Sequence, residues 1–452
     1  MLIARSPWDW ATVVAEVPET APEAIAAAVA AMAGAFPGWA TRKDRPERLR
    51  AFAAVLIARR AALVDLLVRE AGNCRADAEA EADLLPRKIA ITLDAGMART
   101  PGVAAPRAGE ATIAWRARGV AAVLGPFNFP LHLLHGLVVP ALAVGCTVVA
   151  KPSEHCPALG ELYRACLAEA GLDAVATVVQ GGRAVAERLV DHPAIATVAA
   201  VGGRPTGVAL SRRLVARPEV VLALELGGVN HALVLPDADP ASAVAAIAEG
   251  AWKMAGQRCT ATRVVHVPLA ALDAWILRLA AARAAWLPAA DPNGACGRMI
   301  SPAARAAFQA PYQALPSGYD LIAGSARSVD ERDCAADPLL LVARAGADPA
   351  EPLVRDEHFG PALVMLPYRD LDAAIACAAA NPYRLAASVF TADPAAFARI
   401  AARLPYGQVN HNRPTAGARS ELPFGGCGLS GNGRPAAVAA NAIFADETVV
   451  WG

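Results

Sequence analysis

The sequence predicts an α/β protein built from two open, mostly parallel sheets. Between residues 120 and 225, short apolar runs rich in β-branched residues alternate with helical patterns. A strand that is continuously apolar is typical of a parallel sheet whose two faces are both covered by helices. A second alternation of the same kind follows residue 227. The pattern therefore favours two doubly wound α/β domains, with ligands bound beyond the carboxyl ends of the strands.

Length and composition agree with this prediction. The chain has 452 residues, more than one hydrophobic core usually serves, so we expect two or three domains. Hydrophobic residues make up 55% of the chain and charged residues 19%, which excludes a disordered protein. The 42 Lys and Arg balance the 42 Asp and Glu. Without a net charge, neither nucleic acid nor a membrane surface is an expected partner.

The cysteines and the termini indicate a cytoplasmic protein. The nine cysteines, an odd number, include no C-x-x-C pair, which argues against a disulfide framework and against a structural zinc site. No secretory signal is visible at the N-terminus. Residues 131–150 carry no formal charge, but they include Pro140 and Gly145 and fit a buried helix followed by a buried strand.

The elements can be placed by their periodicity and their stop signals. The first hundred residues are predicted to be helical, with helices at 24–36, ended by Pro37-Gly38, and at 46–71, ended by Gly72-Asn73. In the first sheet we expect strands at 120–124, 147–150, 177–179, 197–201 and 220–224, and helices at 133–144, 159–170, 184–190 and 207–216. Further on, we expect helices at 241–254, 269–286, 371–380 and 395–403, and strands at 263–267, 362–366 and 387–390.

Two turns of the first sheet are candidates for binding a nucleotide. Gly202, Gly203 and Gly207 follow the fourth strand, where backbone N–H groups at a helix start could receive a phosphate. No G-x-G-x-x-G follows the first strand, however, and an ordinary βα turn explains these glycines equally well. Lys151 and Glu154 follow the second strand and could bind ribose hydroxyls. Alternatively, this K-P-S-E segment is a surface loop in which Ser153 caps the next helix.

Three residues could carry covalent chemistry. Cys259 lies among small and polar residues between a helix and a strand, where backbone N–H groups and Arg258 could lower the pKa of its thiol. The alternative is an inert buried cysteine. Glu225 ends a strand before two glycines, a position that suits a general base or simply a turn. The amide of Asn128 could stabilise an oxyanion together with the Cys259 N–H, or it could cap a helix.

Six short motifs occur in a fixed order along the chain. They are G-P-F-N-F-P at 125–130, K-P-S-E at 151–154, E-L-G-G at 225–228, G-Q-R-C at 256–259, H-F-G-P at 358–361 and P-F-G-G at 423–426. With these motifs the sequence resembles the aldehyde dehydrogenase superfamily over nearly its full length. Within the superfamily it is most similar to the succinylglutamic semialdehyde dehydrogenases, on residues 88–91, 179–183, 255–260 and 428–435.

The resemblance implies a role for each motif residue. It implies a catalytic nucleophile, Cys259, a general base, Glu225, and an oxyanion-hole amide, Asn128. It implies NAD as the cofactor, with NADP possible, bound by Phe127, Lys151, Ser153, Glu154, Gly202, Gly203, Gly207, Glu357 and Phe359. For the substrate it implies contacts from Arg258, Thr260, His132, Arg413 and Phe424, although either arginine could equally tie loops together. No metal is required.

The resemblance also implies a domain plan and an assembly. The cofactor domain would comprise residues 1–100 and 119–225, and the catalytic domain residues 226–425. A small β oligomerisation hairpin would use 101–118 and the C-terminal segment 426–452. The apolar end of that segment, an exposed edge in a monomer, favours a homodimer or homotetramer over a monomer that covers its own edge.

The resemblance implies oxidation of an aldehyde to the carboxylic acid through a cysteine thioester, with an acidic semialdehyde such as N-succinylglutamate semialdehyde as the expected substrate. Two alternatives stay open: a CoA-acylating aldehyde dehydrogenase and a catalytically silent member of the family. Two positions depart from the family pattern. Residues 200–203 are A-V-G-G where F-T-G-S is usual, and Val229 replaces the usual Lys or Asn.

Overall fold

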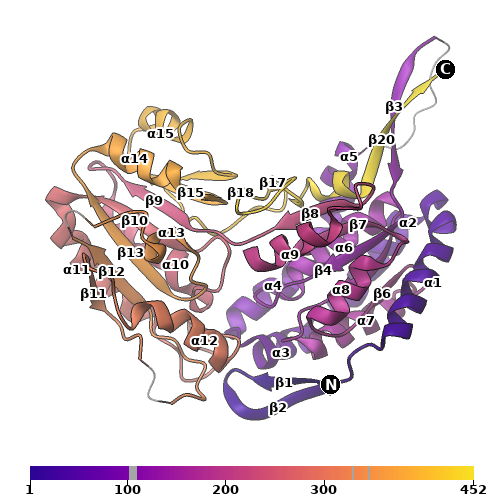
Figure 1. Cartoon of the computed structure of the whole chain (residues 1–452), viewed down its shortest axis with the longest axis horizontal. Coiled ribbons are helices and arrows are strands. Elements are labelled where there is room, and N and C mark those ends of the chain that lie inside the picture. Colours follow the sequence, from indigo (N-terminus) through magenta and orange to yellow (C-terminus); the bar gives the residue numbers. More distant parts are fainter. Residues whose placement is uncertain (101–108, 328–329, 345–346) are drawn as a thin grey trace.

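Two α/β lobes and a projecting two-stranded arm make up the molecule (Figure 1). The structure, a computed structural model, describes residues 1–100, 109–327, 330–344 and 347–452. Each lobe is built around one sheet, and both sheets are sandwiched between helices. The predicted fold class, two doubly wound α/β units with a small β hairpin, is confirmed.

The first lobe contains a five-stranded, fully parallel sheet in the order β6-β5-β4-β7-β8. Its strands are β4 (Val120–Leu124), β5 (Thr147–Lys151), β6 (Ala176–Val178), β7 (Ile195–Val201) and β8 (Val221–Glu225). All residues of β4 and β5 are buried, which explains why these segments are continuously apolar. The five strands predicted from the sequence all form, each shifted by two residues at most.

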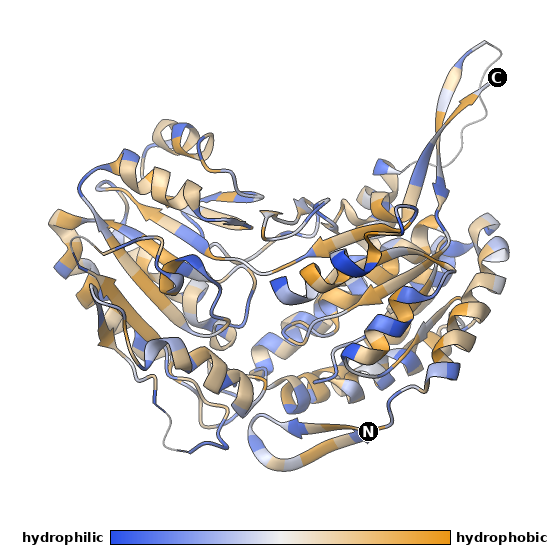
Figure 2. Cartoon of the chain, viewed as in Figure 1, coloured by the Kyte–Doolittle hydropathy of each residue, from blue (hydrophilic) through white to orange (hydrophobic). Residues whose placement is uncertain are grey.

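Helices cover both faces of this sheet. One face packs on α1 (Pro22–Thr41), α8 (Arg183–Asp191) and α9 (Arg204–Leu214). The other packs on α6 (His132–Val144) and α7 (Pro157–Glu169), which are backed by α2 (Arg45–Ala58), α3 (Arg60–Ala71) and α4 (Arg75–Ile91). The short α5 (Met97–Arg99) follows. In Figure 2 the strands are mostly orange, that is hydrophobic, whereas blue residues gather on the outer sides of the helices.

The second lobe contains a seven-stranded sheet in the order β11-β12-β13-β10-β9-β15-β16, parallel except for β11. Its strands are β9 (Asn230–Val234), β10 (Thr262–Pro268), β11 (Tyr319–Ala323), β12 (Leu339–Ala343), β13 (Ala362–Tyr368), β15 (Ala386–Phe390) and β16 (Gln408–His411). Helices α10 (Pro240–Trp252) and α11 (Leu272–Ala282) cover one face. The other face packs on α12 (Pro302–Gln309), α13 (Pro352–Arg355), α14 (Leu371–Ala380) and α15 (Pro394–Ala401).

The N-terminal segment differs from its prediction. Residues predicted to be helical or loop form an antiparallel hairpin of β1 (Leu2–Ser6) and β2 (Asp9–Val17). Alternate residues of β1 are buried, Leu2 and Ala4 among them, so this strand has the period of two that a half-covered sheet requires. The prediction of an all-helical first hundred residues is therefore wrong for this hairpin.

Two helix boundaries also differ. Helix α1 runs through Pro37 and ends at Thr41, because Trp39 is buried and its indole Nε1 donates to the Leu142 carbonyl at 3.1 Å. This tertiary contact holds the last turn in place despite the proline. The single helix predicted for 46–71 is two helices, α2 and α3, which meet at Arg59, where φ is −90° and ψ is 4°. Gly72 ends α3 with φ +72°, the left-handed conformation that the stop signal predicted.

One described helix is long and apolar enough to cross a membrane. It is α1, not the uncharged stretch 131–150. In the structure α1 lies on the five-stranded sheet and buries Ile25, Val29 and Met32 against it. The uncharged stretch forms α6 and β5, both inside the lobe, as the sequence predicted.

Two buried carboxylates fix the starts of the helices behind β4 and β5. Glu81 of α4 accepts the backbone N–H groups of Leu131 and His132 at 3.0 and 2.9 Å. Glu70 of α3 accepts those of Ala158 and Leu159, both at 2.8 Å. A buried carboxylate at a helix N-terminus satisfies donors that have no partner within the helix. Glu81 thereby also fixes the turn that carries Asn128.

The arm consists of β3 (Ala111–Ala117) and β20 (Ala445–Trp451), which pair antiparallel over their full lengths. It projects from the first lobe and carries the C-terminus (Figure 1). Ile113, Val449 and Trp451 are exposed on it. Residues 101–108 of the predicted hairpin lie outside the described residues. A projecting pair of strands with exposed apolar side chains is the kind of edge that soluble proteins normally cover.

Candidate active site

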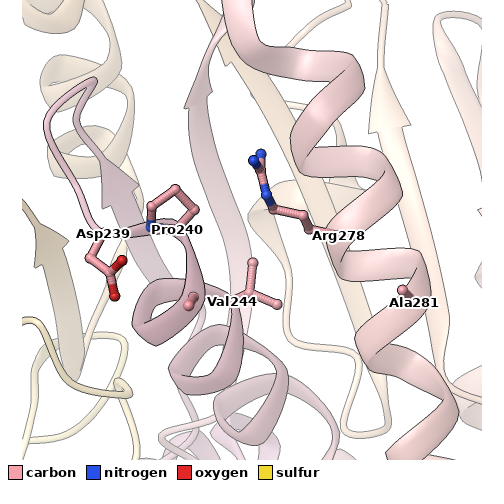
Figure 3. A pocket seen from close by; sticks show the side chains of 6 residues that line it. Asp239, Pro240, Val244, Arg278 and Ala281 are labelled. Carbon is pink, nitrogen blue, oxygen red and sulfur yellow. The ribbon is translucent and has the colours of Figure 1, made fainter.

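The predicted site residues gather where the two lobes face each other. Asn128, Lys151 and Glu225 follow or end the parallel strands β4, β5 and β8, so all three lie at the carboxyl edge of the five-stranded sheet. Cys259 comes from the loop between α10 and β10 of the second lobe, and Glu357 from the loop before β13. The shallow pocket of Figure 3 between α10 and α11, lined by Asp239, Val244 and Arg278, contains none of these residues.

A buried asparagine holds the Cys259 loop. The Asn230 side chain, at the start of β9, donates to the carbonyls of Cys259 and Ala261, both at 2.8 Å. Its Oδ1 accepts the N–H of Ala386 on β15 at 3.0 Å. Gly228 lies so close that a Cβ atom there would be 2.4 Å from the Cys259 carbonyl oxygen. The thiol is therefore held by the central strands of the second sheet.

The backbone before Cys259 is strained. Met254, Ala255 and Gly256 have φ values of +58°, +50° and +65°. Non-glycine residues in this left-handed region cost of order 1–3 kcal/mol each and cluster at functional sites. Arg263, buried on β10, donates to the Gly256 carbonyl at 2.6 Å and to the Gly360 carbonyl, which keeps the loop in this conformation. The strain supports a functional role for the loop.

Burial raises the pKa of the Cys259 thiol, and the neighbouring carboxylates of Glu225 and Glu357 raise it further. The Thr260 N–H and the charge of Arg258 oppose this only in part. The expectation that Arg258 lowers the pKa of the thiol below its usual value is therefore wrong for this state. The Arg258 guanidinium is directed instead at the carbonyls of Glu249 and Gly250, at 2.5 and 3.1 Å, which favours its structural alternative.

Glu225 is the last residue of β8 and is 1% exposed. Burial raises its pKa to about 8, and the Gly426 N–H and the charge of Arg434 offset only part of this shift. The C-terminal segment 430–432 pairs with the backbone on either side of Glu225: the Leu226 N–H donates to Ser430 and the Asn432 N–H to Leu224, both at 3.0 Å. A carboxylate with a pKa near neutrality can exchange protons at physiological pH.

The buried Lys151 and the exposed Glu154 form an ion pair at the end of β5. Lys151 Nζ donates to the Pro152 carbonyl at 2.9 Å and to Glu154 at 3.4 Å. Ser153 does not cap α7: its hydroxyl accepts the His155 N–H at 3.3 Å, and Glu70 caps the helix. The Ser153 cap of the surface-loop alternative is therefore wrong. Lys151 is 5% exposed, whereas Glu154 lies at the surface.

The start of α9 offers room for a phosphate. Helix α9 has no side-chain cap at Gly203, and a Cβ atom at Gly202 or Gly203 would meet nothing closer than 3.5 Å. Backbone N–H groups at such a helix start suit an anion. Gly207 has a different role: a Cβ atom there would be 2.6 Å from Leu226, so this glycine permits close packing of the helix on the strand.

Glu357 occupies space that a glycine leaves free. A Cβ atom at Gly227 would be 1.9 Å from its Oε2, and its Oε1 accepts the Gly228 N–H at 2.9 Å. Nearby, the rings of Phe127 and Phe359 meet edge to face at 5.8 Å and link the two lobes. Together with Lys151 and the open start of α9, these residues fit a dinucleotide lying across the carboxyl edge of the first sheet.

Some of the residues predicted to contact the substrate lie beside Cys259, and others do not. Phe424 is buried in a small cluster with Leu385 and Ala437, against which Cys259 packs. Thr260 is buried, and its carbonyl accepts the Thr415 hydroxyl at 2.7 Å. Two further candidates lie outside this cluster. His132 is half-buried at the start of α6, its ring 6.2 Å from that of Phe129, and Arg413 is exposed.

The sequence did not single out Glu81, Asn230 or Lys88, although all three are buried polar residues near these elements. Asn230 directly follows the E-L-G-G motif region and Lys88 lies in one of the stretches that carry the resemblance. These residues could have been found from the sequence because each places a charged or amide side chain in a helix or strand that is otherwise mostly apolar on its buried side.

Comparison with known proteins identifies the family. Residues 4–448 match the aldehyde dehydrogenase family. The N-succinylglutamate 5-semialdehyde dehydrogenase of Caulobacter sp. (strain K31) is 39% identical over 421 residues, which cover 91% of this chain and 85% of that protein. Its counterpart in Erwinia tasmaniensis is 37% identical over 424 residues, 91% of this chain and 84% of that protein.

Solved structures agree. Aldehyde dehydrogenase C of Pseudomonas syringae, a mutant of which was determined with NAD+ and octanal, superposes with a TM-score of 0.93 at 28% identity, covering 99% of this chain and 93% of that one. The NAD-dependent aldehyde dehydrogenase of Sinorhizobium meliloti gives a TM-score of 0.92 at 26% identity, covering 99% and 90%. The chain thus belongs to the aldehyde dehydrogenase family and is an NAD-dependent aldehyde dehydrogenase.

Proposed function

We propose that this enzyme oxidises an acidic semialdehyde, such as N-succinylglutamate semialdehyde, to the carboxylic acid through a thioester on Cys259. The observation that supports the mechanism is that Cys259, from the second lobe, and the buried Glu225, at the end of β8, meet at one site, close enough for the Glu225 carboxylate to act on the thiol. The substrate class is supported by the similarity to N-succinylglutamate 5-semialdehyde dehydrogenases along 91% of the chain.

In the proposed first step, the Cys259 thiol gives up its proton to a water molecule and the sulfur attacks the aldehyde carbon. The resulting oxyanion accepts hydrogen bonds from the Asn128 amide and the Cys259 N–H, which stabilise the charge as it develops. The cofactor would be held by Lys151, Glu154, Glu357 and the start of α9. When bound, NAD+ supplies a ring that accepts the hydride from the carbon attached to sulfur, which leaves a thioester.

In the second step, Glu225 takes a proton from a water molecule that attacks the thioester carbon. The carbon–sulfur bond breaks, the acid leaves, and the thiol regains a proton. General bases work best when their pKa lies near the working pH, and burial raises that of Glu225 to about 8. The presence of this buried base favours water over a CoA thiol as the acyl acceptor, because a thiol is nucleophilic enough without it.

We further propose that the enzyme works in the cytoplasm as a homodimer or homotetramer. The free thiols of all nine cysteines are compatible with a reducing compartment. The exposed apolar residues of the arm, Ile113, Val449 and Trp451, would be covered in an assembly. The domain boundaries that we propose are those expected from the sequence: a cofactor domain of residues 1–100 and 119–225, a catalytic domain of residues 226–425, and a bridging segment of residues 101–118 and 426–452.

Replacing the nucleophile should abolish oxidation. Cys259→Ala should leave folding and NAD+ binding intact but reduce turnover by several orders of magnitude, because the covalent pathway is lost. Steady-state NADH formation measures the loss, and Cys377→Ala, which removes another partly exposed thiol, is the matched control. Retention of more than about a hundredth of wild-type turnover would sink the assignment.

Replacing the base should separate the two steps. Glu225→Gln should give a burst of about one NADH per active site, followed by turnover slowed about a hundredfold or more, the usual scale for loss of a general base. In the wild type, thioester hydrolysis should rise about tenfold per pH unit up to about pH 8, because only the ionised carboxylate accepts the proton. Stopped-flow NADH traces across pH measure both effects. Normal turnover of Glu225→Gln, or acyl-CoA as the wild-type product, would contradict the hydrolytic mechanism.

The enzyme should prefer NAD+ to NADP+. Glu154, paired with Lys151, would repel a 2′-phosphate at the ribose. We expect kcat/KM to favour NAD+ in the wild type and the preference to shrink in Glu154→Gln, which removes the charge and keeps the shape. A wild-type preference for NADP+ would show that Glu154 does not face the ribose.

The arm should mediate assembly. Trp451→Asp together with Val449→Asp places charges on its exposed apolar face and should shift the enzyme towards monomers, because charged side chains are costly to bury in an interface. Size-exclusion chromatography with light scattering gives the mass. A wild-type monomer, or an unchanged assembly in the double variant, would refute this role for the arm.

A further inference from the structure

Lys88 is a buried cation without an ion-pair partner. It lies on α4, is 6% exposed, and its Nζ donates to the Ser420 hydroxyl at 3.3 Å. No carboxylate of the described residues comes within 4.0 Å of this nitrogen. Burial lowers the pKa of Lys88 to about 8, so most of the population is still charged at pH 7. A buried ammonium group without a counter-charge is costly, and such groups normally have a partner.

The residues around Lys88 leave space for its amine. A Cβ atom at Gly136 of α6 would lie 2.9 Å from Lys88 Cε and 3.1 Å from Nζ, so a larger residue would force the end of the lysine side chain to shift. The charge of Lys88 helps to lower the pKa of His132, also on α6. The buried Nδ1 of His132 has no hydrogen-bond partner among the described residues. Lys88, which has a hydrogen bond but no ion-pair partner, and His132, whose Nδ1 has no hydrogen-bond partner among the described residues, thus lie near each other, between α4, the start of α6 and Ser420.

The two segments near Lys88 that carry His132 and Ser420 also carry residues predicted to belong to the active site. His132 is four residues beyond Asn128, and Ser420 is four residues before Phe424, which packs in the cluster that contacts Cys259. Four residues of fully extended chain span at most about 14 Å. Lys88 is thus connected, through Ser420 and through His132, to the short segments that carry Phe424 and Asn128.

The other nearby charges are already engaged. Glu421, the acid that acts on Lys88 at longer range, is exposed and pairs with Arg87 at 3.3 Å and with Arg419 at 3.9 Å. The Arg258 guanidinium is bound to backbone carbonyls. Arg413 is exposed to solvent, where an ion pair with a substrate is worth little. Among these cations, Lys88 combines burial with a free charge.

We propose that Lys88, assisted by the Ser420 hydroxyl, binds a carboxylate of the substrate and so sets the preference for acidic aldehydes. This inference rests on the proposed function, since it assumes oxidation of an aldehyde at Cys259. A buried, charge-assisted hydrogen bond to a carboxylate would supply Lys88 with its missing partner. His132, whose Nδ1 has no hydrogen-bond partner among the described residues, lies near enough for the charge of Lys88 to act on it.

The test compares N-succinylglutamate semialdehyde with its neutral dimethyl ester, which has the same backbone and no carboxylate. In Lys88→Met we expect kcat/KM for the acid to fall at least about 30-fold, chiefly through KM, while kcat/KM for the ester changes less than about threefold. Ser420→Ala, in a loop, should produce a smaller loss in the same direction. Arg87→Met, which removes an exposed cation one residue away, is the matched control and should change neither.

Binding provides a second readout. In the Cys259→Ala background, which cannot form the thioester, isothermal titration should show weaker binding of the acid aldehyde when Lys88→Met is added, with the affinity for the ester unchanged. Lys88→Arg, which keeps the charge, should restore part of the preference.

The outcomes separate the two proposals. Equal wild-type efficiency towards acid and ester would overturn the substrate class and with it this role of Lys88. A wild-type preference for the acid that persists in both Lys88→Met and Ser420→Ala would overturn the role of Lys88 alone. Equal losses on acid and ester in both variants would assign Lys88 and Ser420 a structural role. Loss confined to the acid supports the proposal.

Discussion

The active site depends on one fully buried side chain, the amide of Asn230. Its hydrogen bonds join the loop of the nucleophile to β9, β10 and β15, the centre of the second sheet. Because the amide is completely satisfied, it adds specificity without the cost of an unpaired polar group. The Cys259 loop can therefore hold a left-handed backbone at Met254 and Ala255, since the strain is balanced by contacts in a rigid part of the fold.

The charges that act on the Cys259 thiol come from both lobes. Each lobe contributes a buried carboxylate, Glu225 from the first sheet and Glu357 from the second, and both disfavour a thiolate. A thiol that stays protonated is slow to react with oxidants, because the thiolate is the reactive form. The resting site thus protects a partly exposed cysteine, and reaction requires a change in the charge around it.

The sequence predicted the parallel sheets well, and it allowed the motif residues to be located along the chain, because both depend on local patterns. Continuous apolar runs such as that of β4 identify strands covered on both faces, and the short motifs lie at the strand ends. It failed where contacts between distant segments decide the outcome. Helix α1 continues beyond Pro37 because the Trp39 indole donates a hydrogen bond to the Leu142 carbonyl. The β1–β2 hairpin packs against neighbouring helices. The pKa of Cys259 depends on residues about 30 and 100 positions away, so its direction could not be inferred from the loop alone.

The close contact between Lys88 and Gly136 has an evolutionary consequence. A Cβ atom at position 136 would lie 3.1 Å from the Lys88 amine, so a side chain there would force the end of the lysine to shift. A relative with a larger residue at position 136 would therefore have to place its amine elsewhere or replace the lysine. We expect these two positions to change together, so that enzymes with a bulky residue at the one carry an uncharged residue at the other and accept neutral aldehydes.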